Sequence, residues 1–403
     1  MKINDQTLKI EEKGTFMTRK FIFISIVGIL LSLVGYYNDP RFFHSYLVTY
    51  LFFLTLSLGG LFFVLAHHMF GADWSTSLRR IPENLMLLAP LMLILSIPII
   101  CNFDSLYQWT NPEYWDHHSL LEGKKAYLNK PFFFIRIGIC FTVWFVLISR
   151  LYTLSLNQKT AADKIKIKNT SAAGIALFAL TISFFGFDAI MSLDPSWFST
   201  MFGVYIFSGS FLSATAFVTL MALFLRSKGI LIDEINRKHY ANLGKVLFAF
   251  TVFWAYIGGF QYYIIWYGNL PEETYWFIQR WEGPWKYLSI FLIFGHFVVP
   301  FFILIFNRLK RSRVVLGVMS TFFLFLHWID MYWLVMPNYF RDSHGYIKEE
   351  ELNNLSILSW TDLSITIAIG GLLMAVFWRL FKTNSIVPSN DLDYKKSISK
   401  EES

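Results

Sequence analysis

The sequence contains very little cysteine: only Cys101 and Cys140 occur in 403 residues, and no C-x-x-C-H motif is present. Two cysteines are too few for an iron–sulfur cluster with four cysteine ligands, and without the motif a c-type haem has no attachment site. Both cysteines lie at or within apolar segments, which favours buried free thiols. Any electron transfer that involves this chain therefore requires clusters or haems on partner subunits.

Charged residues are also scarce, at 16% of the chain, whereas 55% of the residues are hydrophobic and the mean hydropathy is +0.46. This composition is too apolar for a soluble domain of such length. Apolar stretches of about 20 residues, enough to cross a hydrocarbon layer about 30 Å thick, recur along the chain. They predict transmembrane helices at Lys20–Tyr36, Phe43–His67, Pro82–Cys101, Pro131–Leu151, Ser171–Met191, Thr200–Leu225, Leu243–Tyr267, Trp285–Phe306, Val314–Met336 and Ile357–Phe381. We therefore expect an all-α integral membrane protein with about ten transmembrane helices.

Polar segments are short. The first apolar stretch follows a leader of mixed charge without a small-residue cleavage site, so we expect a retained helix rather than a signal peptide. The longest connections are residues 102–130 and 338–354, the second with three glutamates at 349–351, and the polar tail 383–403 is expected to be disordered. None of these segments is large enough to form a catalytic domain.

The basic residues predict the orientation of the chain in the membrane. With the N-terminus inside, about 26 of the 35 Lys and Arg residues fall on the inner side, which satisfies the positive-inside rule. Both termini are therefore expected in the cytoplasm. Membrane orientation also accounts for the net charge of +7, so we expect no nucleic-acid partner.

One motif occurs twice. Asp188 is followed by proline seven positions later and by phenylalanine ten positions later, and Asp330 is followed by the same two residue types at the same spacings. Weaker matches relate Arg79-Arg80 to Arg237-Lys238, Arg150-Leu151 to Arg308-Leu309, and Tyr50, Phe52 and Phe62 to Tyr205, Phe207 and Phe217. These matches follow one order along the chain, which favours duplication of a four-helix unit.

The duplication predicts an architecture of two parallel four-helix repeats between flanking helices. Residues 43–199 and 200–356 form the repeats, residues 1–42 hold the N-terminus and first helix, and residues 357–403 hold the tenth helix and tail. Because four crossings separate the repeats, both start on the same side of the membrane. Small residues in the second and sixth predicted helices permit close backbone approach where lipid supplies no hydrophobic drive.

Ionisable residues within membrane segments are candidates for a functional site. Asp188 and Asp330 fall in the outermost turns of their helices, where a carboxylate is either hydrated at the headgroup level or part of a proton route. His327 shares a helical face with Asp330, and His296 lies near the middle of its helix, so carboxylate and imidazole could exchange a proton there. Tyr332 could extend the hydrogen bonding. For His296 the alternatives are a satisfied interhelical hydrogen bond and, less favoured, a b-type haem ligand together with His327.

Four further residues are candidate contacts of a quinol or of the same proton route. Arg136 either reaches outwards or pairs with an acid such as Asp188. His67 and His68, at the inner end of their helix, are either interfacial or the cytoplasmic mouth of the route, and Tyr263 is either a membrane anchor or a hydrogen-bonding step. An outer-side carboxylate or histidine among aromatic side chains also suits a quinol pocket, because quinol oxidation requires a proton acceptor.

Four segments of the sequence carry a resemblance to a known family: MSLDPSWFSTMFGVYIFSGS at 191–210, ANLGKVLFAFTVFWAYIGGFQYYIIWYGNLPEET at 241–274, GHFVVPFF at 295–302 and HWIDMYWLVMP at 327–337. They closely resemble the family of F-type membrane subunits of bacterial alternative complex III, within the broader NrfD-like membrane anchors that include the polysulfide-reductase anchor. The resemblance covers nearly the whole chain. It implies a ten-helix fold in the bacterial inner membrane and no haem bound to this chain.

The resemblance also implies partners and an activity. Such a complex oxidises quinol, either menaquinol or ubiquinol, and passes electrons through iron–sulfur and c-haem subunits to a cytochrome c or a terminal oxidase. A homologous NrfD-like subunit is expected beside this chain, with lipids around both. A proton-transfer role for Asp188, His296, His327 and Asp330 is carried over as a hypothesis. Two other classes stay open: a stand-alone secondary transporter, and a purely structural anchor of another redox complex.

Overall fold

The computed structural model describes residues 10–117, 119–232, 234–340 and 358–388, together with Asp391, Tyr394 and Ser397. Within these residues the protein is all-α, without strands, and ten helical spans are long and apolar enough to cross a membrane. The predicted fold class is therefore confirmed. The loop glutamates at 349–351 lie outside the described residues.

Seven spans are continuous helices. They are α1 (Glu11–Asn38), α2 (Phe42–Phe70), α8 (Lys130–Leu156), α9 (Ala161–Ala189), α10 (Phe202–Ser227), α11 (Arg237–Gly268) and α17 (Trp360–Phe381). An eighth, α15 (Arg313–Val335), continues into the 3₁₀ turn η8 (Met336–Asn338). Apolar runs located each span, but several helices extend beyond them because helical hydrogen bonding continues into the polar flanks.

The remaining two spans are interrupted, which the sequence interpretation missed. One helix was expected at Pro82–Cys101, but the span forms three helices, α3 (Arg80–Met86), α4 (Ala89–Leu95) and α5 (Ile97–Cys101). Pro90 and Pro98 begin α4 and α5, because proline lacks the N–H that a continuous helix needs. The other interrupted span runs through α13 (Trp285–Leu292), the π-helical turn η6 (Ile293–Val298) and α14 (Val299–Leu304).

Helices α2 and α10 form the centre of the bundle, packed against each other. Helix α2 also contacts α9 and α3, and α10 also contacts α11 and α15. Gly59 permits this packing, because a Cβ atom there would lie 2.0 Å from the Ser210 carbonyl oxygen of α10. The first helices of the two proposed repeats are thus neighbours, while the duplication itself stays a prediction.

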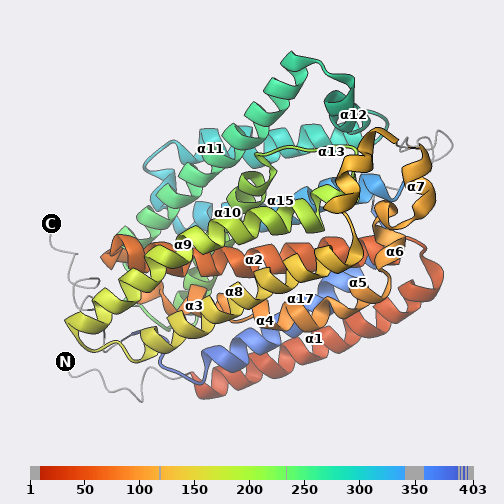
Figure 1. Cartoon of the computed structure of the whole chain (residues 1–403). Helices are drawn as coiled ribbons and strands as arrows, with labels where there is room; N and C mark the ends of the chain where they lie inside the picture. The colour runs from red at the N-terminus through yellow and green to blue at the C-terminus, as the bar shows by residue number, and fades with distance from the viewer. Residues whose placement is uncertain are drawn as a thin grey trace.

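The first and last spans form a pair at one side of the bundle. Helix α1 packs along α17, and α17 packs against α2 (Figure 1). A Cβ atom at Gly28 of α1 would lie 2.4 Å from the Ala368 backbone nitrogen, so glycine is required for this approach. Only 17% of the apolar window of α1 is buried, so most of this helix faces outwards.

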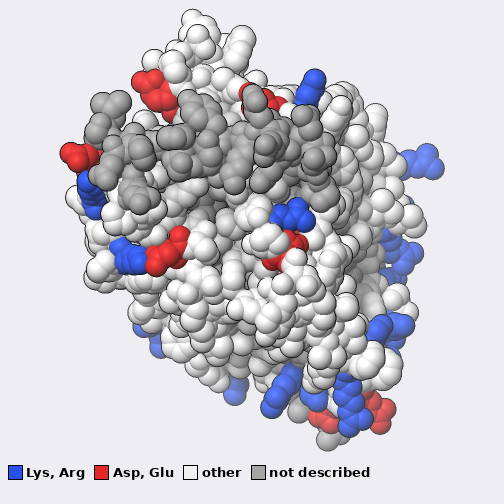
Figure 2. All heavy atoms as spheres, turned by 90° about the vertical axis from the view of Figure 1, so that its right-hand side faces the viewer, with Lys and Arg blue, Asp and Glu red and all other residues white. Residues whose placement is uncertain are grey.

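The two ends of the bundle differ. The start of α1 and the end of α17 lie at one end, here called the terminal end, and α6 (Phe103–Leu106), α7 (Pro112–His117) and α12 (Pro271–Gln279) lie at the opposite end (Figure 1). Figure 2 views the opposite end, where most visible described atoms are uncharged and charged side chains are scattered. Exposed ion pairs, Lys130–Asp104 and Lys125–Glu122, lie in the segment between α5 and α8.

Three described residues near the C-terminus pack against the terminal end. Asp391 forms an ion pair with buried Arg79 at 2.5 Å, and Tyr394 and Ser397 are also buried. The hydroxyl of Ser397 lies 2.9 Å from that of Ser77. The expectation of a disordered tail is therefore wrong for these described residues, because polar side chains of the bundle supply partners that composition alone does not show.

Candidate functional site

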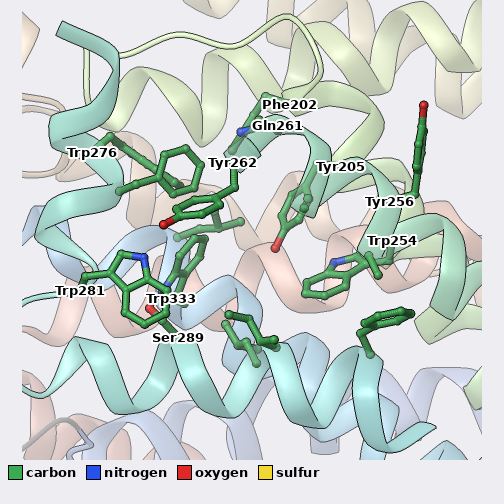
Figure 3. Close-up of a pocket in the computed structure, with 18 of the residues that line it drawn as sticks. Phe202, Tyr205, Trp254, Tyr256, Gln261, Tyr262, Trp276, Trp281, Ser289 and Trp333 are labelled. Atoms are coloured by element: carbon green, nitrogen blue, oxygen red, sulfur yellow. Dashed lines mark hydrogen bonds between the residues drawn. The ribbon is translucent and has the colours of Figure 1, made fainter. Parts of the chain in front are cut away.

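An apolar cavity of about 470 Å³ lies between α10, α11, α12, α13 and α15 (Figure 3). Because α12 forms part of its wall, the cavity reaches towards the end of the bundle opposite the terminal end (Figure 1). Its volume falls within the range of small-molecule sites, roughly 300–1,000 Å³. Its aromatic lining consists of Phe202, Tyr205, Trp254, Tyr256, Tyr262, Trp276, Phe277, Trp281, Phe297 and Trp333. The few polar groups on its wall include Gln261 and Ser289.

Asp330 lies directly behind this wall. Its carboxylate is buried, and it accepts hydrogen bonds from the Tyr205 hydroxyl at 2.5 Å and from the Trp254 indole N–H at 3.4 Å. Both donors line the cavity, and their rings lie side by side in Figure 3. Among the described residues, no cation is ion-paired with Asp330. The carboxylate is therefore separated from the cavity by one hydroxyl group.

Glycines permit this arrangement of side chains. A Cβ atom at Gly209 of α10 would lie 3.1 Å from the His327 ring and 3.8 Å from Asp330 Oδ2, so the α10 backbone passes close to both groups. A Cβ atom at Gly258 of α11 would lie 3.0 Å from the Tyr205 ring. Small residues thus let α10, α11 and α15 converge on the carboxylate.

His327 extends the site towards α2. Its Nε2 lies 2.9 Å from the Thr55 hydroxyl, and that hydroxyl donates to the Leu51 carbonyl at 2.7 Å. Since the only proton of Thr55 is used there, a neutral His327 donates through Nε2 and leaves Nδ1 as an acceptor. Nδ1 is buried and has no hydrogen-bond partner among the described residues. The fold thus places an unused proton acceptor one helical turn from Asp330.

His296 packs against the ring of Trp254. Its ring centroid is 3.9 Å from that of Trp254, and neither ring nitrogen has a hydrogen-bond partner within the described chain. The residue belongs to the π-helical turn η6, a distortion that recurs at functional sites. Asp330 and His296, both predicted from the sequence, thus contact the Tyr205–Trp254 pair, and His327 lies one helical turn from Asp330.

Asp188, the other repeated aspartate, is in a different environment. The Arg136 guanidinium donates to both of its carboxylate oxygens, each at 2.8 Å, and also to the Tyr127 carbonyl at 3.1 Å. Burial raises the pKa of the Tyr127 phenol, and the nearby charge of Asp188 raises it further. Asp188 is completely buried and Arg136 nearly so. This bidentate pair compensates the charge of Asp188 and joins α8 to α9.

The other sequence candidates lie outside the cavity wall. Tyr332 is fully buried and stacks on Trp328, with ring centroids 5.5 Å apart. Tyr263 is 53% exposed on the surface of α11. His67 and His68 lie at the terminal end, where His67 Nδ1 is 2.6 Å from the Ser75 hydroxyl.

Glu83 anchors a buried charged cluster beside these two histidines. It pairs with Arg79 at 3.1 Å and with Arg80 at 2.7 Å, and it accepts a hydrogen bond from Ser155. Arg79 and His68 both line a small polar opening there. Nothing described connects this cluster to Asp330.

Sequence reasoning missed Tyr205 and Trp254 as members of the site. The repeat matched Tyr205 to Tyr50, and this is the one signal that singles it out among 20 tyrosines. Trp254 carries no comparable signal. Among the described residues, no group of three or more His, Cys, Asp or Glu is placed to hold a metal ion.

The fold and this site define an all-α, multi-pass membrane protein with a buried carboxylate beside an aromatic cavity. A scan against known protein families found no match, and a search of curated proteins found none either.

Proposed function

We propose that this chain is a haem-free membrane subunit of a bacterial quinol-oxidising complex of the alternative complex III type. In this proposal the aromatic cavity binds a quinol, Asp330 accepts a proton from it, and electrons leave to iron–sulfur and c-haem partner subunits. Both termini are cytoplasmic, which puts the cavity in the outer half of the inner membrane. The chain is not expected to act as an enzyme alone.

One observation carries the proposal: Tyr205 and Trp254 line the cavity and also hydrogen-bond to Asp330. A quinol ring suits a flat apolar space with aromatic walls, and its hydroxyl requires a polar partner at one edge. Tyr205 is that partner, because its hydroxyl both donates to the carboxylate and has lone pairs that accept a hydrogen bond from the quinol.

The proton would move in two linked transfers. As the first electron leaves the quinol for a partner subunit, one quinol hydroxyl passes its proton to the Tyr205 oxygen while Tyr205 passes its own proton to Asp330. The second electron and the proton of the other hydroxyl follow by the same route once Asp330 has passed the first proton on. Asp330 becomes neutral, and the free Nδ1 of His327 is the next acceptor. Asp188 is not part of this route, because both of its carboxylate oxygens accept hydrogen bonds from Arg136 and it does not line the aromatic cavity. The duplicated aspartates would thus have separate roles, one in proton transfer and one in holding helices α8 and α9 together.

Filling the cavity tests the proposal. A Cβ atom at Gly259, which lines the cavity, meets nothing within 4 Å, so Gly259→Leu should place its side chain there without a backbone clash. In the purified complex we expect the KM for quinol to rise about tenfold or more, since a methylene-sized obstruction in a close-fitting pocket costs roughly 1–3 kcal/mol.

Gly138 on α8 supplies the matched control. A Cβ atom there also meets nothing within 4 Å, but Gly138 lines the smaller cavity of about 170 Å³ in the first repeat. Gly138→Leu should leave the KM unchanged. An unchanged KM in Gly259→Leu, or an equal rise in both variants, would argue against quinol binding in the aromatic cavity.

A secondary transporter is the second candidate, because two spans are interrupted and broken helices are typical of transport sites. Solute uptake by the purified chain in liposomes, without partner subunits, would favour that function. Quinol-dependent electron transfer that requires co-purifying haem and iron–sulfur subunits would favour the redox complex.

A further inference from the structure

The terminal end of the bundle contains a further cavity, of about 530 Å³, whose lining is strongly basic. Five arginines line it: Arg226, Arg237, Arg308, Arg311 and Arg313. They come from the end of α10, the start of α11, the connection after α14 and the start of α15. Within the described part of the chain, none of the five forms an ion pair. Five positive charges around one hollow, without an ion-pair partner among the described residues, favour an anionic ligand.

A buried polar group supports this assignment independently of the charges. Tyr240 also lines the cavity and is only 2% exposed, yet its hydroxyl has no hydrogen-bond partner among the described residues. A buried hydroxyl without a partner costs about 1–3 kcal/mol, which a ligand oxygen in the cavity would remove. The hydroxyl can donate to such an oxygen beside the guanidinium groups.

The helices add to the positive potential. Helix α11, of 32 residues, and α15, of 23 residues, both begin at this cavity, and the N-terminal end of a helix carries partial positive charge. Arg226 is held in place by donating to the Ile232 and Ile235 carbonyls, both at 2.7 Å. Arginine forms bidentate hydrogen bonds to phosphate, so the preferred ligand chemistry is a phosphate group.

The surroundings indicate that this phosphate belongs to a lipid. Val314 lines the cavity and is 76% exposed, and Val318, one turn further along α15, is 63% exposed. Phe325, on the same side of α15, is 48% exposed. An apolar strip therefore runs from the basic cavity along a membrane-spanning helix, as an acyl chain would.

We infer that this cavity binds the phosphate headgroup of an anionic phospholipid from the leaflet at the terminal end, with its acyl chains along α15. The site is separate from the aromatic cavity and does not depend on quinol binding. The bound lipid would contact the ends of α10, α11, α14 and α15 at the terminal end. It would thereby stabilise the packing of these helices, of which α10, α11 and α15 also line the aromatic cavity.

Binding of phosphatidylglycerol to the purified full-length chain in detergent tests this inference. The triple variant Arg308→Ala, Arg311→Ala and Arg313→Ala should bind on the order of a hundredfold more weakly, because three phosphate-facing charges are lost. The control variant Arg150→Ala, Lys166→Ala and Lys168→Ala removes the same charge from exposed positions elsewhere, and its affinity should change by less than about threefold.

Two further arms separate the possible outcomes. Tyr240→Phe removes only the unpartnered hydroxyl and should weaken phosphatidylglycerol binding by about 3- to 10-fold without a change in net charge. Inorganic phosphate should compete poorly, since it lacks acyl chains. Equal losses in the triple and control variants would overturn the site in favour of diffuse attraction, and competition by inorganic phosphate as strong as by the lipid would overturn the lipid assignment.

Discussion

At the scale of single residues, the two aspartates show how the same side chain acquires different properties. Asp188 accepts two hydrogen bonds from the Arg136 guanidinium. Asp330 instead accepts hydrogen bonds from the Tyr205 hydroxyl and from the Trp254 indole N–H. An adjacent cation favours the charged carboxylate, while neutral donors leave protonation accessible to a buried acid. In the proposed function, Asp330 is therefore the aspartate that takes part in proton transfer, and Asp188 is not.

Asp330→Asn should lower the quinol oxidation rate of the purified complex by about 10²-fold or more, because an amide of nearly equal shape cannot accept the proton. The amount of assembled complex should stay unchanged. Quinol-dependent acceptor reduction, measured across pH, checks the prediction. Asp362→Asn, at another buried carboxylate on α17, is the matched control and should retain turnover. Equal turnover in Asp330→Asn and wild type would show that Asp330 has a structural role and does not accept the proton.

Asp188→Asn should instead destabilise the protein by about 3–5 kcal/mol, since it leaves the Arg136 charge buried and unpaired. The melting temperature of the purified protein in detergent is the measurement. The double variant Arg136→Met, Asp188→Leu should recover most of the loss, because apolar replacement of both partners removes the unpaired charge. Additive losses in the double variant would contradict an ion-pair origin.

The residues of the site were only partly predictable from the sequence. Asp330, His327 and His296 stand out because ionisable side chains are rare within apolar runs. Their proximity to Tyr205 and Trp254 depends on how α10 and α11 pack, and no local pattern in a sequence with 43 phenylalanines, 20 tyrosines and 14 tryptophans specifies that. The Arg136–Asp188 pair was one of two alternatives until the helices were placed.

At the scale of elements, helix existence was predictable and helix continuity was not. Length and hydropathy alone locate all ten spans, because a membrane requires about 20 apolar residues in a helix. Pro90 and Pro98 lie at the breaks after α3 and α4. They did not predict these breaks by themselves, because many membrane helices tolerate proline without interruption. Pro300, in the first turn of α14, marks the π-turn around His296 in the same way, because it lacks the N–H that an α-helical bond to the His296 carbonyl would need.

Close helix packing gives a prediction at this scale. Gly59→Ala would put a methyl group 2.0 Å from the Ser210 carbonyl oxygen, so α2 and α10 must separate. We expect a destabilisation of about 1–3 kcal/mol and a lower melting temperature in detergent. Gly317→Ala on α15 is the matched control, because its methyl group would make an ordinary 3.5 Å contact with Leu223. Equal melting temperatures for the two variants would show that the α2–α10 contact can relax without cost.

At the scale of the whole molecule, the first and last spans are joined by a carboxylate. Asp39, between α1 and α2, accepts hydrogen bonds from the hydroxyls of Thr361 at 2.5 Å and Ser359 at 2.7 Å, at the start of α17. Residues more than 300 positions apart thus meet at one corner. Sequence analysis treated α1 and α17 only as flanking helices, because nothing in either apolar run identifies the other as its partner.

This corner predicts a specific response to acid. Burial would raise the pKa of Asp39, but hydrogen bonds from Thr361 and Ser359 and the charge of Arg41 outweigh it and lower the pKa below the usual 3.8. A carboxylate with a lowered folded-state pKa stabilises the fold above its unfolded-state pKa and loses that contribution as pH falls through the folded-state value. Asp39→Asn should therefore lower the melting temperature at neutral pH, and the difference from wild type should shrink once the pH falls below about 4. Thr361→Val removes the shorter hydrogen bond and should reproduce part of the same pH dependence. A difference between Asp39→Asn and wild type that stays constant down to strongly acidic pH would show that the ionised carboxylate does not hold α17 to α1.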